Sequence, residues 1–154
     1  MSLKTLRISR INIFIKNVLP RSIFILNSLR RPTMLKYICY PKCTTCQKAK
    51  KWLDDNKSEY ELRDIKEDNP SLEELTVWYK MSGLPLKKFF NTSGLLYKSM
   101  ELKDKLPTMS EEDQLKLLAT DGMLIKRPLL IGEDFVLVGF KESDWAINYT
   151  IYFK

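Results

Sequence analysis

Two cysteines separated by two residues, Cys43 and Cys46, are the side chains of this chain best suited to chemistry. They lie where an apolar run, Leu35 to Tyr40, gives way to a helical pattern that begins near Thr45. At such a strand-to-helix corner, unpaired backbone N–H groups and the positive end of the helix dipole favour thiolate over thiol. The second cysteine follows one helical turn later on the same face, where it can attack an adduct on the first. The spacing predicts a redox pair, with Cys43 as nucleophile and Cys46 as resolving thiol.

Other interpretations of the cysteines, as structural thiols or as zinc ligands, are less favoured. Two structural thiols are one alternative, but buried cysteines seldom fall together at a helix start beside lysines such as Lys42 and Lys48. Cys39, inside the apolar run, is expected to be a small core residue and not a third redox partner. The chain has no histidine, so three cysteines would leave a zinc site one strong ligand short, and Ser-His and Cys-His catalysis are excluded. There is no Gly-rich phosphate loop, so we expect no cofactor.

The net charge of +7 belongs to the N-terminal part of the chain. Residues 1–33 hold seven of the 26 basic residues and no acid, so the remaining 19 bases balance the 19 acids of residues 34–154. The basic charge is therefore no sign of direct nucleic-acid binding by the domain.

Residues 1–33 form a basic leader whose apolar residues are interrupted by Lys16, Pro20 and Arg21. No apolar run approaches the roughly 20 residues of a membrane span, and no secretory cleavage pattern follows, so we expect a cytoplasmic protein without a membrane anchor. The leader fits an amphipathic targeting segment, but we favour translation starting at Met34, which leaves it disordered or absent from the native protein. Mass spectrometry of the native N-terminus would decide between the two.

The remaining pattern predicts an α/β domain over residues 34–154. A strand at Leu35–Cys39, a helix from about Thr45 to Asn56 and a strand at Glu59–Asp64 form a β-α-β unit, with Tyr60 and Leu62 on one side of the second strand. A helical insert at about 70–122 follows, with capping-box patterns at Ser71/Glu74 and Ser110/Asp113 and short helical turns over Leu84–Leu106. Two apolar runs around Gly132–Asp134 predict a hairpin, and a helix over Ser143–Tyr149 closes the chain.

The chain resembles the thioredoxin fold in three features: the Cys-x-x-Cys corner, the β-α-β…β-β-α order and a proline before the third strand. This resemblance implies a four-stranded mixed sheet. Residues 34 to about 149 resemble the arsenate reductase family and its Spx- and MgsR-like branch. The segments that carry the resemblance are Tyr40–Cys46, Ser82–Gly94, Lys126–Pro128 and Val138–Glu142.

The resemblance implies further site residues. In the thioredoxin fold the proline, here Pro128, is cis and faces the dithiol, so Arg127 would direct its guanidinium at the sulfur and stabilise a thiolate or a bound oxyanion. Glutaredoxin-coupled arsenate reductases use three arginines around one cysteine, but the other two positions match Asn91 and Gly139 here. Losing two positive charges weakens arsenate binding and thiolate stabilisation together.

Three functions follow from the resemblance, in order of preference. The first is an arsenate reductase-like thiol-disulfide oxidoreductase that uses Cys43, Cys46 and Arg127 and is reduced by glutaredoxin, thioredoxin or a low-molecular-weight thiol. The second is an Spx-like redox regulator whose disulfide controls binding to the RNA polymerase α subunit. The third is a true arsenate reductase.

Several polar and aromatic residues have a simpler interpretation. Lys87, Lys88, Asn91 and Ser93 could line a cleft, but we expect them to solvate a loop. The three tryptophans, at positions 52, 78 and 145, are expected to be core or surface-patch residues and not a cofactor site.

Overall fold

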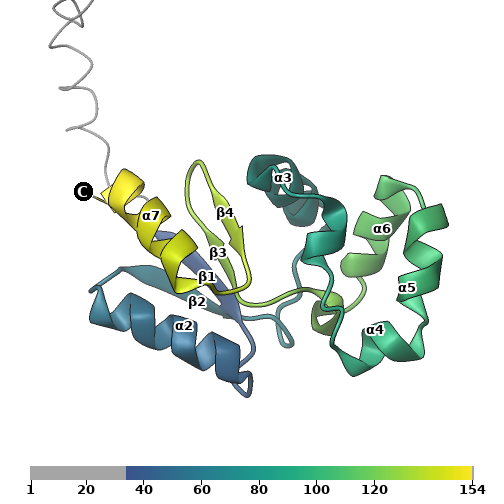
Figure 1. Ribbon diagram of the computed structural model, residues 1–154, viewed down its shortest axis with the longest axis horizontal. Helices are drawn as coiled ribbons and strands as arrows, with labels where there is room; N and C mark the ends of the chain where they lie inside the picture. The colour runs from purple at the N-terminus through teal and green to yellow at the C-terminus, as the bar shows by residue number, and fades with distance from the viewer. Residues whose placement is uncertain (1–33, 154) are drawn as a thin grey trace, which may run out of the picture. The chain divides into compact units, whose positions relative to one another are not determined.

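The computed structural model describes residues 34–153, which form a four-stranded mixed sheet flanked by helices (Figure 1). Its strands, in chain order, are β1 (Leu35–Cys39), β2 (Tyr60–Asp64), β3 (Leu129–Ile131) and β4 (Val136–Val138). The spatial order is β2-β1-β3-β4; β1 pairs with β2 in parallel, and the other two pairings are antiparallel. The expectations on residues 1–33, including the start at Met34, lie outside the described residues.

Two helices cover one face of the sheet: α2 (Thr44–Asp55) and α7 (Glu142–Phe153). Successive residues of a strand point to opposite faces, so Leu35 and Tyr37 of β1 pack against these helices while Ile38 packs on the other side. Trp145 of α7 is 1% exposed and joins this layer. The start of α2, which carries the dithiol, is therefore anchored on a buried surface.

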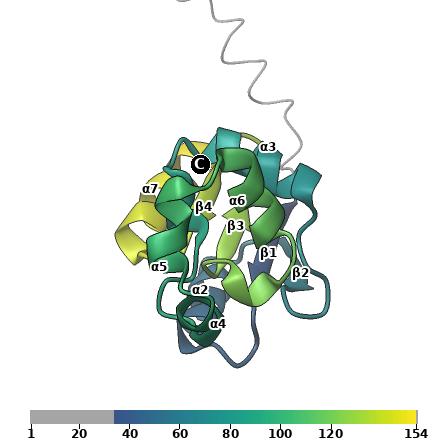
Figure 2. The ribbon, with the colours of Figure 1, turned by 90° about the vertical axis from the view of Figure 1, so that its right-hand side faces the viewer.

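The helical insert covers the opposite face. It consists of α3 (Leu72–Ser82), η1 (Leu86–Phe89), α4 (Leu95–Ser99), α5 (Leu102–Lys105), η2 (Leu106–Thr108), α6 (Glu111–Leu118) and η3 (Gly122–Leu124). In Figure 2, helices α4, α5 and α6 lie in front of the strands. The predicted capping box of α3 is present, and Ser110 caps α6 by accepting a hydrogen bond from the Asp113 N–H. Helix α3 ends at Gly83, whose left-handed backbone glycine adopts at low cost.

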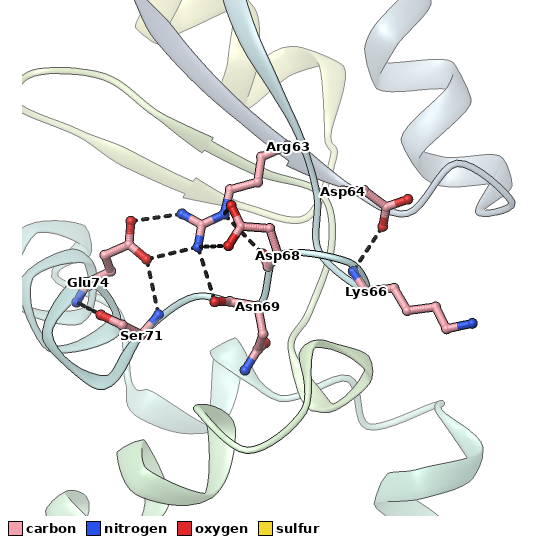
Figure 3. A network of polar contacts seen from close by, with 7 residues as sticks. All are labelled: Arg63, Asp64, Lys66, Asp68, Asn69, Ser71 and Glu74. Atoms are coloured by element: carbon pink, nitrogen blue, oxygen red, sulfur yellow. Dashed lines mark hydrogen bonds and ion pairs between the residues drawn. The ribbon is translucent and has the colours of Figure 1, made fainter.

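A polar network centred on Arg63 of β2 joins the sheet to the insert (Figure 3). Arg63 donates two hydrogen bonds to the carboxylate of Glu74 in α3, at 2.8 and 3.1 Å, and one to the carbonyl of Asn69. The Asn69 side chain in turn donates to the carbonyl of Ala119 at 2.6 Å. The network thus fixes the segment that leads into η3.

Close packing fixes the same segment a few residues further on. A Cβ atom on Gly122 would lie 2.1 Å from the carbonyl oxygen of Ile65, so only glycine allows this approach. Residues 119–122 are therefore held near the end of β2 by two contacts, the hydrogen bond from Asn69 to Ala119 and the close packing of Gly122 against Ile65.

The strand order and the helices on both faces confirm the expected thioredoxin-like α/β fold. The expected placement of Tyr60 and Leu62 on one side of the second strand is confirmed, because they pair with Leu35 and Tyr37 of β1, which face α2. Tyr60 packs there, whereas Leu62 is 55% exposed, since β2 is an edge strand.

Candidate active site

Cys43 occupies the N-cap position of α2. Its carbonyl accepts the first helical hydrogen bond, from the Gln47 N–H at 3.0 Å, and its own N–H donates to the carbonyl of Tyr40 at 3.0 Å. An N-cap side chain lies beside the free N–H groups of the first helical turn. The corner that the sequence predicted is therefore formed, with Cys43 partly exposed at its tip.

Opposing effects act on the pKa of Cys43. Burial raises it, but hydrogen bonds from the Cys46 N–H, the Cys46 thiol, the Arg127 side chain and the Thr45 N–H lower it, and the pKa falls below the ordinary cysteine value. All of these donors stabilise negative charge on the sulfur. The surroundings of Cys43 thus favour the thiolate, the nucleophilic form of cysteine.

Cys46 has the opposite character. It is 2% exposed, and burial together with the nearby Cys43 and Cys39 raises its pKa to about 12, against a lowering by the backbone of Tyr40. Its side chain is in turn one of the groups that lower the pKa of Cys43. The two cysteines therefore differ in character, the pKa of Cys43 being lowered and that of Cys46 raised.

Tyr37 is a feature of the site that the sequence analysis missed. This β1 residue is completely buried, and its hydroxyl donates a 2.6 Å hydrogen bond to the carbonyl of Cys46. Burial and the neighbouring cysteines raise its pKa far above the ordinary value, so the hydroxyl stays a donor. The first turn of α2 is thereby tied to the centre of the sheet.

Arg127 and Pro128 lie in the segment that leads into β3. The peptide bond between them is cis, as the resemblance implied. Besides its interaction with Cys43, the Arg127 guanidinium lies 5.2 Å from the ring centroid of Tyr40 and donates to the sulfur of Met123 at 3.4 Å. Pro128 is buried and accepts a hydrogen bond from the Gly139 N–H. The structure brings Cys43, Cys46 and Arg127 together, whereas Pro128 is not among the residues that line the pocket described next.

Cys43 opens into a pocket of about 600 Å³. Its lining comes from the α2 corner, the loop before α4 and the segment around η3: Cys43, Thr45, Asn91, Ser93, Gly94, Leu95, Leu96, Asp121, Met123, Lys126 and Arg127. Two cations, Lys126 and Arg127, and the exposed Leu95 thus line the same pocket as Cys43.

The expectation that Asn91 only solvates a loop was wrong. Asn91 is 9% exposed and its side chain donates to the Met123 carbonyl, while its N–H donates to the Leu124 carbonyl at 2.7 Å. Ser93 also lines the pocket and donates to the Asn91 side chain, whereas Lys87 and Lys88 lie outside the lining. The burial of Asn91 was not predicted because its hydrogen-bond partners lie more than 30 residues further along the chain. The family resemblance did offer a signal, since it matches Asn91 to one of the three arginines of the arsenate reductases.

Within residues 34–153 there is no group of three or more cysteine or carboxylate side chains placed to hold a metal ion. None of the helices of this part of the chain has the length and hydropathy needed to cross a membrane.

Comparison with known proteins places this site in a family. The ArsC family profile matches residues 38–148. The uncharacterised protein YusI of Bacillus subtilis is 55% identical over 116 residues, which are 75% of this chain and 98% of YusI. The global transcriptional regulator Spx 1 of Bacillus cereus is 29% identical over 68% of this chain and 78% of its own length.

A solved structure agrees in fold. The crystal structure of an ArsC family related protein from Bacteroides fragilis superposes with a TM-score of 0.74 at 56% identity, over 76% of this chain and 98% of that chain. The matched residues of the profile span the Cys43–Cys46 corner, the insert and β3, and the chain therefore belongs to the ArsC family.

Proposed function

We propose that this ArsC family protein is a thiol-disulfide oxidoreductase in which Cys43 is the nucleophile, Cys46 the resolving thiol and Arg127 a thiolate-stabilising residue. The observation that carries the proposal is the unequal pair: the partly exposed Cys43 has a lowered pKa, and the buried Cys46 has a raised one. Such a difference assigns the attacking and the resolving role to different sulfurs.

In the first step, the Cys43 thiolate attacks one sulfur of an oxidised disulfide substrate. The substrate S–S bond breaks, one half leaves as a thiolate, and the other half stays bonded to Cys43. The cationic Arg127 and the N-terminal N–H groups of α2 hold the attacking sulfur in its charged form before the bond forms.

Formation of the adduct also activates Cys46. The charge on Cys43 is one of the factors that raise the pKa of Cys46, together with burial, and it disappears when Cys43 becomes covalently bonded. Cys46 can then lose its proton to solvent and attack the Cys43 sulfur, which releases the second half of the substrate. The substrate gains two electrons, and the protein ends as a Cys43–Cys46 disulfide.

A thiol donor must return the protein to its dithiol form. Glutaredoxin, thioredoxin or a low-molecular-weight thiol in the cytoplasm would supply the two electrons by the reverse exchange. The pocket beside Cys43 leaves the sulfur accessible to such a donor.

The test is a single-turnover reaction of the reduced protein with glutathione disulfide, followed by mass spectrometry. We expect the wild type to form the Cys43–Cys46 disulfide, Cys46→Ser to stop at a mixed disulfide on Cys43, and Cys43→Ser to be inert. A mixed disulfide that accumulates mainly on Cys46 would overturn the assignment of roles.

A second candidate is a redox regulator, and the similarity to Spx 1 of Bacillus cereus favours it. In this function the same disulfide would control affinity for the RNA polymerase α subunit, and contact with DNA would be indirect. Affinity capture on that subunit under reducing and oxidising conditions separates the two: redox-dependent retention supports the regulator. Absence of binding together with Cys43-dependent turnover supports the oxidoreductase.

Reduction of arsenate itself is the third and least favoured candidate. Asn91 lies in the pocket with Cys43 and Arg127 and adds no charge there, so an oxyanion would meet Arg127 and Lys126 as its cations. An assay coupled to glutaredoxin tests this directly. Wild-type turnover no faster than that of Cys43→Ser would eliminate arsenate as a substrate.

A further inference from the structure

Met123 places a thioether in the wall of the pocket that holds the reactive cysteine. It lies in η3, is partly exposed, and lines the pocket together with Cys43 and Arg127. Its sulfur accepts a hydrogen bond from Nη1 of Arg127 at 3.4 Å. Because a thioether is a weak acceptor, this contact holds the guanidinium only loosely.

Apart from its interaction with the Cys43 sulfur, the other contacts of Arg127 are also weak. Its Nε is buried and has no hydrogen-bond partner among the described residues, and its remaining neighbour on one side is the ring of Tyr40, 5.2 Å from the centroid. A guanidinium offers five N–H donors, and the Nε donor of Arg127 is left without a partner among residues 34–153. A stronger acceptor at the position of the Met123 sulfur would therefore compete effectively for Arg127.

We propose that Met123 is an oxidisable modification site, at which hydrogen peroxide converts the thioether to a sulfoxide that draws Arg127 away from Cys43. This inference rests on the proposed role of Cys43 as nucleophile and adds a way to regulate it. In the reaction, a lone pair of the Met123 sulfur attacks one peroxide oxygen and the O–O bond breaks. One oxygen is bonded to sulfur, the other leaves as water, and the sulfur loses two electrons to the peroxide.

Oxidation changes the hydrogen bonding in the pocket. The sulfoxide oxygen is a polar acceptor, so it binds the Arg127 N–H groups more strongly than the thioether sulfur does. Cys43 then loses part of the interaction that stabilises its thiolate and reacts more slowly. Methionine sulfoxide reductases reverse the oxidation, so the effect is reversible.

The position of Met123 explains why its oxidation, and not that of another methionine, would affect Cys43. Peroxide that reaches Cys43 also reaches the pocket wall, and the pocket of about 600 Å³ has room for one added oxygen. Met81, Met100 and Met109 instead pack against the hydrophobic core on the insert side of the sheet. Met34 is 64% exposed but lies at the start of β1, away from the pocket lining, so it serves as an internal reference for oxidation.

The experiment uses the full chain with its dithiol first oxidised to the disulfide, which protects Cys43 from peroxide. After treatment with hydrogen peroxide, dithiothreitol restores the dithiol and leaves sulfoxides in place. Peptide mass spectrometry then measures oxidation at Met123 and Met34, and the alkylation rate of Cys43 by iodoacetamide is measured at pH 7. We expect oxidised Met123 and a fall in the Cys43 rate of about fivefold, the effect of weakening a charged hydrogen bond, with recovery after methionine sulfoxide reductase treatment.

Two variants provide matched controls. Met123→Leu keeps a similar volume without the sulfur, so peroxide should no longer slow Cys43, whereas Met100→Leu should behave as the wild type. If Met123→Leu fails to fold, reversal by the reductase in the wild type still decides the question. Met123 that stays unmodified when Met34 is fully oxidised, or an unchanged Cys43 rate when Met123 is oxidised, would overturn the proposal.

The same data separate failure of this proposal from failure of the proposed function. If Cys43 of the untreated wild type reacts no faster than a free cysteine, the function of the dithiol is wrong. If Cys43 reacts rapidly and peroxide leaves the rate unchanged, only the role of Met123 is wrong.

Discussion

The hydroxyl of Tyr37 donates a 2.6 Å hydrogen bond to the carbonyl oxygen of Cys46, across the buried interface between β1 and α2. Tyr37 also packs edge-to-face with Trp145 of α7, with ring centroids 6.3 Å apart. The central strand β1, helices α2 and α7, and Cys46 therefore meet at the Tyr37 side chain. The dithiol is positioned by the core and not by its loop alone.

Replacing Tyr37 with phenylalanine tests this anchor. We expect the free energy of unfolding to fall by about 1 kcal/mol, because a buried hydrogen bond is lost while the ring packing remains. Denaturant unfolding measures the change. Tyr60→Phe is the matched control, since the Tyr60 hydroxyl bonds the Asp54 carboxylate at the surface, and its cost should be smaller. Equal costs would show that the Tyr37 hydroxyl has no special role.

Arg127 is expected to increase the reactivity of Cys43. In Arg127→Met the alkylation rate of Cys43 at pH 7 should fall by about tenfold, since a charged hydrogen bond stabilises a thiolate by about 1.5 kcal/mol. Lys48→Met removes one positive charge from an exposed position of α2 outside the pocket and should leave the rate close to that of the wild type. A similar loss in both variants would mean that only the overall charge matters.

Cys39 is expected to have no part in the disulfide. It is 6% exposed, and burial followed by the charge of Asp64 raises its pKa, so it stays an unreactive thiol. Cys39→Ala should still form the Cys43–Cys46 disulfide at the wild-type rate, with some loss of stability from the smaller side chain. Mapping the disulfide by mass spectrometry checks this, and a bond between Cys39 and Cys46 in the wild type would contradict it.

The Arg63–Glu74 pair should make stability depend on pH. Burial raises the pKa of Glu74, but the hydrogen bonds from Arg63 outweigh it, and the pKa falls below its ordinary value of 4.5. The stabilisation is therefore present above that value and is lost as the pH falls through the lower folded-state pKa. Glu74→Gln should reduce the free energy of unfolding at pH 7 by about 2 kcal/mol.

The check on this pair is urea unfolding at pH 7 and at pH 3. The difference between wild type and Glu74→Gln should shrink at the lower pH, because Glu74 of the wild type is then becoming protonated. A difference that is the same at both pH values would show that the carboxylate charge does not contribute.

Local signals in the sequence were enough to predict most of the fold. The apolar run from Leu35 to Cys39, the capping pair Ser71 and Glu74 and the turn at Gly132–Asp134 each depend on neighbours within a few residues. The strand, the capping box and the turn that they predict are all present in the structure. The dithiol corner belongs to the same class, because a helix start positions Cys43 and Cys46 through local geometry.

The site residues that the sequence did not predict depend on contacts between segments that are distant along the chain. Asn91 enters the pocket because residues 89–91 pair with 124–126, with hydrogen bonds from Asn91 N–H to the Leu124 carbonyl and from Lys126 N–H to the Phe89 carbonyl. Tyr37 and Met123 acquire their roles from partners on other elements, namely Cys46 and Arg127. No periodicity or short motif records such pairings.

The proposed function depends on Cys43 being the acidic, reactive member of the pair. Its acidity can be measured from the rate of iodoacetamide alkylation of Cys43 against pH, with Cys46 replaced by alanine in a parallel sample to remove the second thiol and its hydrogen-bond donor. We expect a midpoint clearly below that of a free cysteine, about 8.5, in the wild type, and a higher midpoint in Cys46→Ala. A wild-type midpoint at or above the free-cysteine value would contradict it.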